Sequence, residues 1–215
     1  MTYLQLVNRV LTRLREDNVD TVSQNTYSNL IGVFVNDAKR LVEQAWDWST
    51  LRSVITVSTV ADDYLYSLPN TNDSSEVMTV VNDTSNTFMQ YATKDWFEKY
   101  LYTTNVLTGS PKYYTYAGLD ANGDTQIMVY PKPDGVYNLR FTTAVRGDEL
   151  VNDTDTTFLP FNPIVQFATG FAIAERGEAG GQSAQETLTV ANRMLSDAIA
   201  LDSARHPEEL IYQVV

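Results

Sequence analysis

The sequence predicts an α+β protein: a helical bundle built from N- and C-terminal helices, with a small antiparallel β-sandwich or β-barrel lobe inserted between them. Apolar residues recur at helical spacing up to about residue 50 and again after about residue 158. Between these regions apolar and polar residues alternate with the period of two that is typical of strands. Because neither helical end can bury its apolar stripe alone, the two ends are expected to pack together.

Two helices are predicted before the first strand. Thr2 and Gln5 fit a capping box, and apolar residues then recur at helical spacing until about Glu16. After a polar turn, a second helix is expected with Arg40 and Glu43 on its polar side. Its core-facing stripe is predicted to consist of Tyr27, Leu30, Phe34, Ala38, Leu41, Ala45 and Trp48.

Seven strands are expected in the β lobe, with turn-forming residues between them. They cover residues 54–58, 64–68, 77–81, 87–91, 112–116, 126–130 and 137–141. The first two are predicted to form a hairpin around a polar turn at 61–63, and the third and fourth a second hairpin. A short helix at 95–102 interrupts the series. This pattern suits a small antiparallel sandwich or barrel.

Helical spacing returns after a linker at 148–157 that is rich in acidic residues and loop formers. Asn162 and Pro163 are predicted to be the N-cap and first residue of a helix that is apolar nearly all round. This helix is therefore expected to be the most buried element. After a break at 180–181, a final helix is predicted over residues 183–203.

These elements predict one discontinuous domain, one inserted domain and a tail. Residues 1–50 and 158–205 are assigned to the helical bundle, 51–147 to the β lobe, and 206–215 to a C-terminal docking tail. An apolar, β-prone terminus outside the last helix frays unless something holds it. It either folds back on its own core or binds another subunit, and the sequence leaves both possibilities open.

Composition excludes several kinds of chemistry. The chain has no cysteine, so disulfides, cysteine nucleophiles and thiolate zinc sites are excluded. The only histidine is His206, which excludes histidine-based triads and two-histidine metal sites. We therefore expect no enzymatic activity, no cofactor and no metal.

The net charge and the length of the apolar segments argue against two kinds of partner, duplex DNA and a lipid bilayer. A formal net charge of -12 with only 15 Lys and Arg residues argues against tight binding of duplex DNA. The same charge is compatible with a surface that lets DNA pass without retaining it, and also with a simple role in solubility. The start of the chain lacks the pattern of an export signal, and the most apolar window, 164–174, is too short to span a bilayer. No membrane association is expected.

Three motifs resemble functional sites but are better explained as turns or solvated charge. Residues 120–124 alternate oxygen-bearing side chains as a calcium loop does, but Thr125 and Pro131 stand where an EF-hand needs glycine and glutamate. The segment instead predicts a hairpin turn. Acid pairs at 62–63 and 208–209 lie in polar surroundings, unlike the acids of a glycosidase, one of which needs an apolar pocket.

In their order and spacing, several short motifs resemble those of a known family. They are Ala45-Trp46-Asp47-Trp48, Tyr66-Ser67-Leu68-Pro69, Gly109-Ser110-Pro111-Lys112-Tyr113-Tyr114, Ile127-Met128-Val129-Tyr130-Pro131-Lys132-Pro133 and Leu159-Pro160. The set covers nearly the whole chain and resembles the head-to-tail adaptor (connector) proteins of tailed bacteriophages, the group that includes tail tubular protein A.

The resemblance implies a structural virion protein that is made in the bacterial host cytoplasm and located at the head-tail interface. It implies a homo-dodecameric ring between the portal and the tail, nozzle or fiber proteins, through which DNA passes without sequence-specific binding. In such families C-terminal segments often dock onto the portal, which gives a candidate site consisting of Leu210, Ile211, Tyr212, Val214 and Val215. The alternatives are a tail-completion or nozzle component of the same virion and a non-viral carbohydrate-binding β protein.

Overall fold

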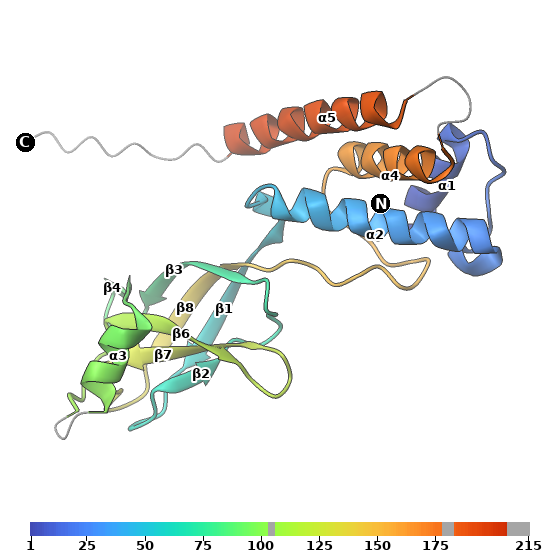
Figure 1. Ribbon diagram of the computed structural model, residues 1–215. Coiled ribbons are helices and arrows are strands. Elements are labelled where there is room, and N and C mark those ends of the chain that lie inside the picture. Colours follow the sequence, from blue (N-terminus) through green and yellow to red (C-terminus); the bar gives the residue numbers. More distant parts are fainter. Residues whose placement is uncertain (103–105, 178–182, 206–215) are drawn as a thin grey trace, which may run out of the picture. The chain divides into compact units, whose positions relative to one another are not determined.

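The computed structural model describes residues 1–102, 106–177 and 183–205. The chain divides into two compact units, a helical unit made of Met1–Thr50 and the chain from Gly147 onward, and a β unit made of Leu51–Arg146 (Figure 1). The predicted α+β fold class, with terminal helices and an inserted β lobe, is therefore confirmed.

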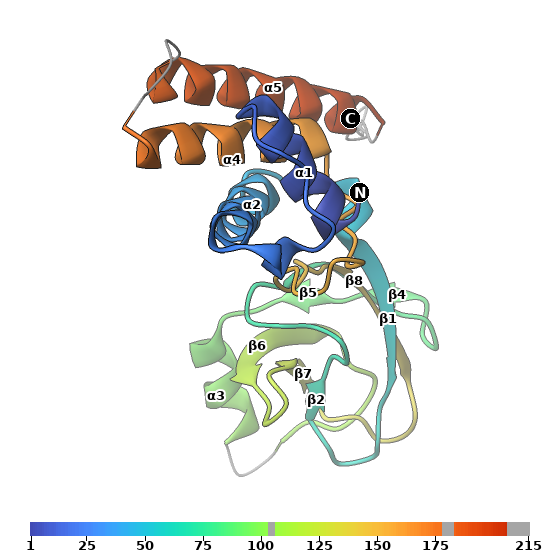
Figure 2. The same cartoon turned by 90° about the vertical axis from the view of Figure 1, so that its right-hand side faces the viewer.

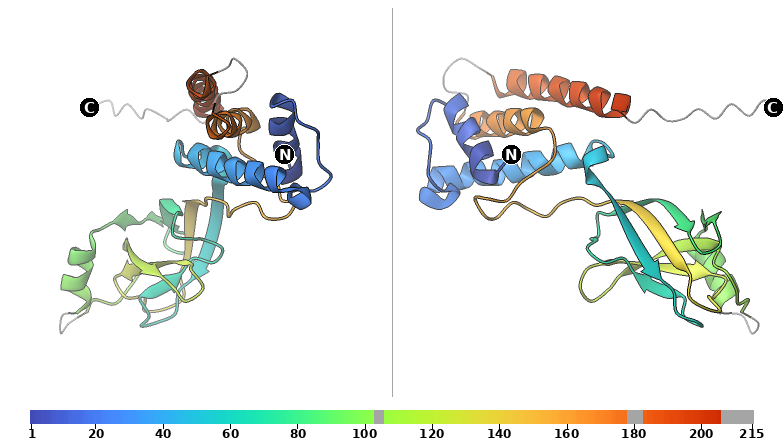
Figure 3. Two further views of the ribbon diagram at one scale, coloured as in Figure 1. Left: turned by 45° about the vertical axis from the view of Figure 1, so that its right-hand side comes forward. Right: turned by 180° about the vertical axis from the view of Figure 1, so that it is seen from behind.

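The helical unit is organised around one central helix. Its elements are α1 (Tyr3–Arg13), a 3₁₀ turn (Val22–Gln24), α2 (Thr26–Gln44), α4 (Phe161–Glu175) and α5 (Ala184–Arg205). Helix α4 contacts α1, α2 and α5, and Figures 1, 2 and 3 all show it between α2 and α5. Ile164, Ala168 and Ala172 on α4 are completely buried, as its nearly all-round apolar sequence predicts.

The helix starts agree only in part with the sequence analysis. The capping box of α1 is confirmed, because Gln5 N donates to Thr2 Oγ1 (3.3 Å) and Thr2 N donates to Gln5 Oε1 (3.2 Å). The predicted N-cap of α4 is wrong: Pro160 occupies the cap position, and Asn162 lies inside the first turn. Pro163 is tolerated there because the first N–H groups of a helix have no intrahelical acceptor.

Helix α2 is shorter than predicted, and its buried face is rotated. It ends at Gln44, so Trp48 lies beyond it, and Leu41 is 46% exposed. Of the predicted stripe, Ala38 is buried on the helix and Trp48 is buried beyond it. The buried residues of α2 are Ser28, Ile31, Gly32, Val35, Ala38, Lys39, Val42 and Glu43. The stripe was misplaced because two charged residues belong to the covered face, which hydrophobic spacing alone does not reveal.

Lys39 and Glu43 form a buried ion pair one turn apart on α2. Their Nζ–Oε1 distance is 2.8 Å, and both side chains are almost fully shielded from solvent. Lys39 Nζ also donates to the carbonyl oxygens of Gly147 (2.8 Å) and Asp148 (2.9 Å), and Gly147 N donates to Glu43 Oε1 (3.3 Å). The expectation that Glu43 faces solvent is therefore wrong, because the chain that returns from the β unit covers it.

The predicted linker is held along the helical unit by hydrogen bonds. Asn36 bonds both backbone groups of Leu150, donating to its carbonyl (3.0 Å) and accepting from its N–H (3.0 Å). Further on, Tyr3 N donates to Asp155 O (2.8 Å), and Thr157 N donates to Met1 O (3.0 Å). These bonds satisfy backbone groups that would otherwise lack partners, so the segment has a defined path to the start of α4.

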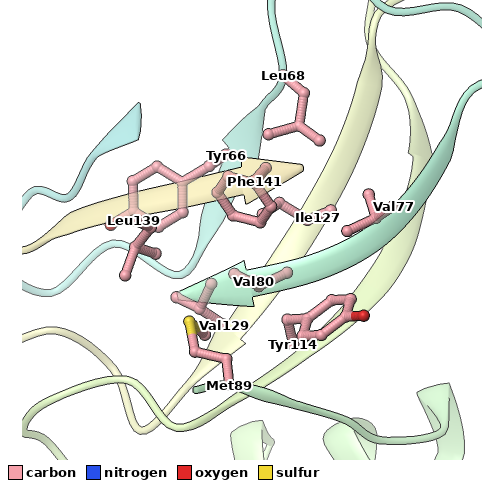
Figure 4. Packing of buried hydrophobic residues seen from close by; sticks show 10 residues of the cluster. All are labelled: Tyr66, Leu68, Val77, Val80, Met89, Tyr114, Ile127, Val129, Leu139 and Phe141. Atoms are coloured by element: carbon pink, nitrogen blue, oxygen red, sulfur yellow. The ribbon is translucent and has the colours of Figure 1, made fainter. Parts of the chain in front are cut away.

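The β unit contains two four-stranded sheets. Its elements are β1 (Arg52–Ser58), β2 (Leu65–Ser67), β3 (Glu76–Asn82), β4 (Thr87–Phe88), β5 (Gln90–Tyr91), α3 (Lys94–Leu101), β6 (Tyr113–Leu119), β7 (Thr125–Tyr130) and β8 (Asn138–Ala144). The strand orders are β1-β8-β3-β4 and β2-β7-β6-β5, and among these described strands only the β5–β6 pair is parallel. Side chains from both sheets fill one apolar core (Figure 4).

Strand pairing differs from the predicted hairpins. Strands β1 and β2 lie in different sheets, pairing with β8 and β7, so the predicted 54–58/64–68 hairpin is wrong. The second hairpin is confirmed only where Val81 faces Phe88 and Asn82 faces Thr87. After buried Met89 the chain leaves that sheet, and Gln90–Tyr91 joins β6. In both hairpins the strand partners are set by strands far away in the sequence, and the residues of the local turn do not predict those partners.

We expect Lys39→Met to lower the free energy of unfolding by about 3–5 kcal/mol, because it leaves the Glu43 carboxylate buried without its counter-charge. The matched control is Arg40→Met, which removes the exposed Arg40–Glu149 pair and should cost less than about 1 kcal/mol. Urea unfolding followed by circular dichroism measures both. Equal losses would show that the pair is not shielded from solvent.

Candidate functional site

The helical unit has an apolar groove beside the C-terminal end of α5. Its volume is about 440 Å³, within the range of ligand-sized clefts. Residues from three separate stretches of sequence line it: Trp48, Phe158, Pro160, Met194, Ala198 and Leu201. The returning chain and α5 thus form its two walls, and both belong to the same compact unit.

The groove has a buried floor and an exposed apolar rim. Trp48 is almost completely buried, and its indole Nε1 donates to Val42 O (2.7 Å), which fixes the ring just beyond the end of α2. Leu159 is also buried, whereas Phe158 is 77% exposed and Leu201 67% exposed. Large apolar side chains that flank a hollow in this way are typical of surfaces that bind another chain.

Asp202 ties the last turns of α5 to the segment that follows α2. Its carboxylate accepts hydrogen bonds from Trp46 Nε1 (3.1 Å), Ser49 N (3.0 Å) and Ser49 Oγ (2.6 Å). The residue is buried, so these charge-assisted bonds are only weakly screened by water. Since Asp202 also lines the groove, it holds the α5 wall against the Trp48 floor.

A second hollow of about 380 Å³ lies near the end of α4 and is mainly polar. Arg176 pairs with Glu16 (2.7 Å) and lies 4.3 Å above the ring of Tyr27. Burial raises the pKa of Tyr27, although the nearby Arg176 guanidinium acts in the opposite direction. Because Arg176 and Glu16 already satisfy each other and no large apolar rim of described residues surrounds them, this hollow is a weaker binding candidate than the groove.

The described ranges contain no cluster of His, Asp or Glu side chains able to hold a metal ion. The 120–124 segment is the hairpin turn that the sequence predicts: Asp120 Oδ1 accepts from the N–H groups of Asn122 (2.8 Å) and Asp124 (3.0 Å), and Gly123 has a φ of +88°. Of the helices within the described residues, none is long and apolar enough to cross a membrane.

The predicted docking residues Leu210, Ile211, Tyr212, Val214 and Val215 lie outside the residues that the structure describes. The groove itself was missed at the sequence level. Phe158 stands in a loop, where apolar residues have no regular spacing. Leu201 comes one turn after Ala198 on the final helix, so its spacing predicts a core residue and not the rim of a groove. A buried aspartate near the end of a helix, which Asp202 proved to be, likewise has no local sequence signal.

The α+β fold and the exposed apolar rim of the groove are features found in proteins that bind another chain. The sequence matches the SU10 adaptor protein family over residues 1–210, and the chain belongs to that family. No curated protein matches the chain. The expectation of a bacteriophage adaptor, a structural virion component, is confirmed at the level of the family, whereas the narrower likeness to tail tubular protein A stays a prediction.

Asp202→Asn should lower the free energy of unfolding by about 1.5–3 kcal/mol, because a neutral amide accepts the three bonds less well and its NH₂ group meets donors. Asp197→Asn, on the exposed part of the same helix, is the control and should change stability by less than about 0.5 kcal/mol. Urea unfolding measures both. Identical behaviour of the two variants would contradict a structural role for Asp202.

Proposed function

We propose that this adaptor forms a homo-dodecameric ring between the portal and the tail or nozzle proteins, and that the ring lines the channel through which DNA leaves the head. The observation that carries the proposal is the match to the adaptor family, which spans both compact units and extends to residue 210. A ring subunit needs no reactive groups. It needs a stable body and surfaces that neighbouring proteins can occupy.

The charge of the chain supports a conduit that does not retain DNA. The net charge is -12, and the 27 Asp and Glu residues far outnumber the 15 Lys and Arg residues. Tight binding of duplex DNA requires clustered positive charges that neutralise phosphates and release counterions. An acidic wall repels the phosphates instead, so DNA slides past without sequence-specific contacts.

The C-terminal residues 206–215 are proposed to dock on the portal. The described part of α5 ends at Arg205, and Asp202 anchors this end to Ser49. The sequence that follows is acidic at first and then apolar and rich in β-branched side chains, with Leu210, Ile211, Tyr212, Val214 and Val215. Such a segment, leaving a firmly held helix, is suited to strand addition or to filling a groove on a partner.

Ring formation can be tested with the full-length protein and its portal. We expect the free protein to be a monomer or small oligomer, and rings stacked on the portal to appear in electron micrographs after mixing. Size-exclusion chromatography with light scattering gives the number of adaptor copies for each portal. Failure of the mixture to form any adaptor ring would contradict the proposed function.

Deleting residues 207–215 should leave the fold intact but weaken portal binding, because the deletion removes the apolar docking residues and no described core residue. Co-sedimentation with portal measures binding, and circular dichroism checks the fold. A full-length variant with Leu210→Ser, Ile211→Ser and Tyr212→Ser should bind as weakly as the deletion. The control, Glu208→Gln with Glu209→Gln, should bind as the wild type does. Undiminished co-sedimentation of the deletion would refute docking by the tail.

A further inference from the structure

We propose that, in the free protein, the apolar groove beside α5 holds residues 210–212 of its own chain. When the tail docks on the portal, it leaves the groove. This second step rests on the proposed portal docking, whereas occupation of the groove in the free protein does not.

The groove is mainly apolar and open at its rim, and Asp197 and Asp202 are the acidic residues of its α5 wall. Phe158 and Leu201 project into solvent on either wall, and Pro160, Met194 and Ala198 line the space between them. Apolar surface around a hollow is stabilised when another apolar segment covers it. The tail is such a segment, since Leu210, Ile211 and Tyr212 are consecutive large apolar or aromatic residues.

The length of the tail matches the distance that it has to cover. The α5 wall extends from Leu201 back to Met194, and the end of the described helix at Arg205 is about 16 Å from Met194 at the α-helical rise. An extended chain covers this distance in about five residues. Ten residues follow Arg205, so a chain that reverses at Pro207 places 210–212 alongside the groove with residues to spare.

The sequence at the start of the tail favours such a reversal. Pro207 has no N–H group to continue the helix, and it disfavours helical geometry at the preceding residue. Glu208 and Glu209 come next, and their carboxylates can remain in water at the turn before the apolar residues begin.

A tail from the same chain is favoured over a tail from a second copy. Asp202 lines the groove and is bonded to Trp46 and Ser49, so the tail is tethered within a few residues of the groove entrance. A short tether gives an effective concentration in the millimolar range. A second copy in a dilute solution of free protein cannot compete with that concentration.

The absence of cysteine from the chain makes a disulfide-trapping experiment free of background. The test variant is full-length Ala198→Cys/Tyr212→Cys, with one cysteine in the groove and one in the tail. The control is Ser196→Cys/Tyr212→Cys, because Ser196 is exposed on α5 and does not line the groove. After mild oxidation, we expect the 198–212 disulfide to form within one chain roughly tenfold faster than the 196–212 disulfide.

Three results would overturn the inference: equal rates for the two pairs, no 198–212 disulfide, or a disulfide that links two chains on a non-reducing gel. Adding Phe158→Ser and Leu201→Ser to the test variant should reduce its rate to that of the control. Both positions are exposed, so the fold is retained, which circular dichroism checks.

Portal binding separates the two proposals. Tyr212 is itself a proposed docking residue, so each variant is compared with its own reduced form: the oxidised 198–212 variant should co-sediment with portal less than the same variant after reduction. Oxidation should leave the binding of the cysteine-free wild type unchanged. Equal co-sedimentation of the oxidised and the reduced variant would overturn release of the tail on docking. A third outcome is possible: the 198–212 disulfide forms in the free protein, but the deletion of the tail does not weaken portal binding. That outcome would refute docking of the tail on the portal and would leave the groove assignment intact.

Discussion

A buried ion pair on α2 sets the path of the chain through the helical unit. Lys39 and Glu43 satisfy each other and also bond the backbone of Gly147 and Asp148, where the chain returns from the β unit. Either charge alone would be strongly unfavourable in this position, so only a segment that supplies both donors and acceptors can cover it. From there the hydrogen bonds of Asn36 continue the path toward the groove.

That path explains why an apolar groove opens beside α5. The returning chain reaches α4 only after placing Phe158 at the surface, and Asp202 holds α5 close enough for Leu201 to form the opposite rim. An adaptor must combine a stable body with parts that neighbours can engage. In this chain the anchored end of α5 and the exposed apolar groove belong to the same compact unit. The residues that follow α5 therefore start close to the groove.

Much of the secondary structure could be predicted because it depends on local patterns. The capping box at Thr2 and the turn at Gly123 were recognised from a few neighbouring residues. The face of α2 could not be predicted in the same way, because Lys39 is a charged residue on a buried surface. Likewise, the partners of β1 and β2 depend on strands that lie far away in the sequence.

By itself the sequence determined the α+β class, the absence of cysteine chemistry and the resemblance to phage adaptors, because composition, periodicity and motif order are properties of the linear chain. Only the tertiary structure decided which charges are buried, which strands share a sheet and where the apolar groove opens. These features arise when residues such as Trp48, Phe158 and Leu201 meet, and their meeting depends on packing and hydrogen bonds between distant segments rather than on any local pattern.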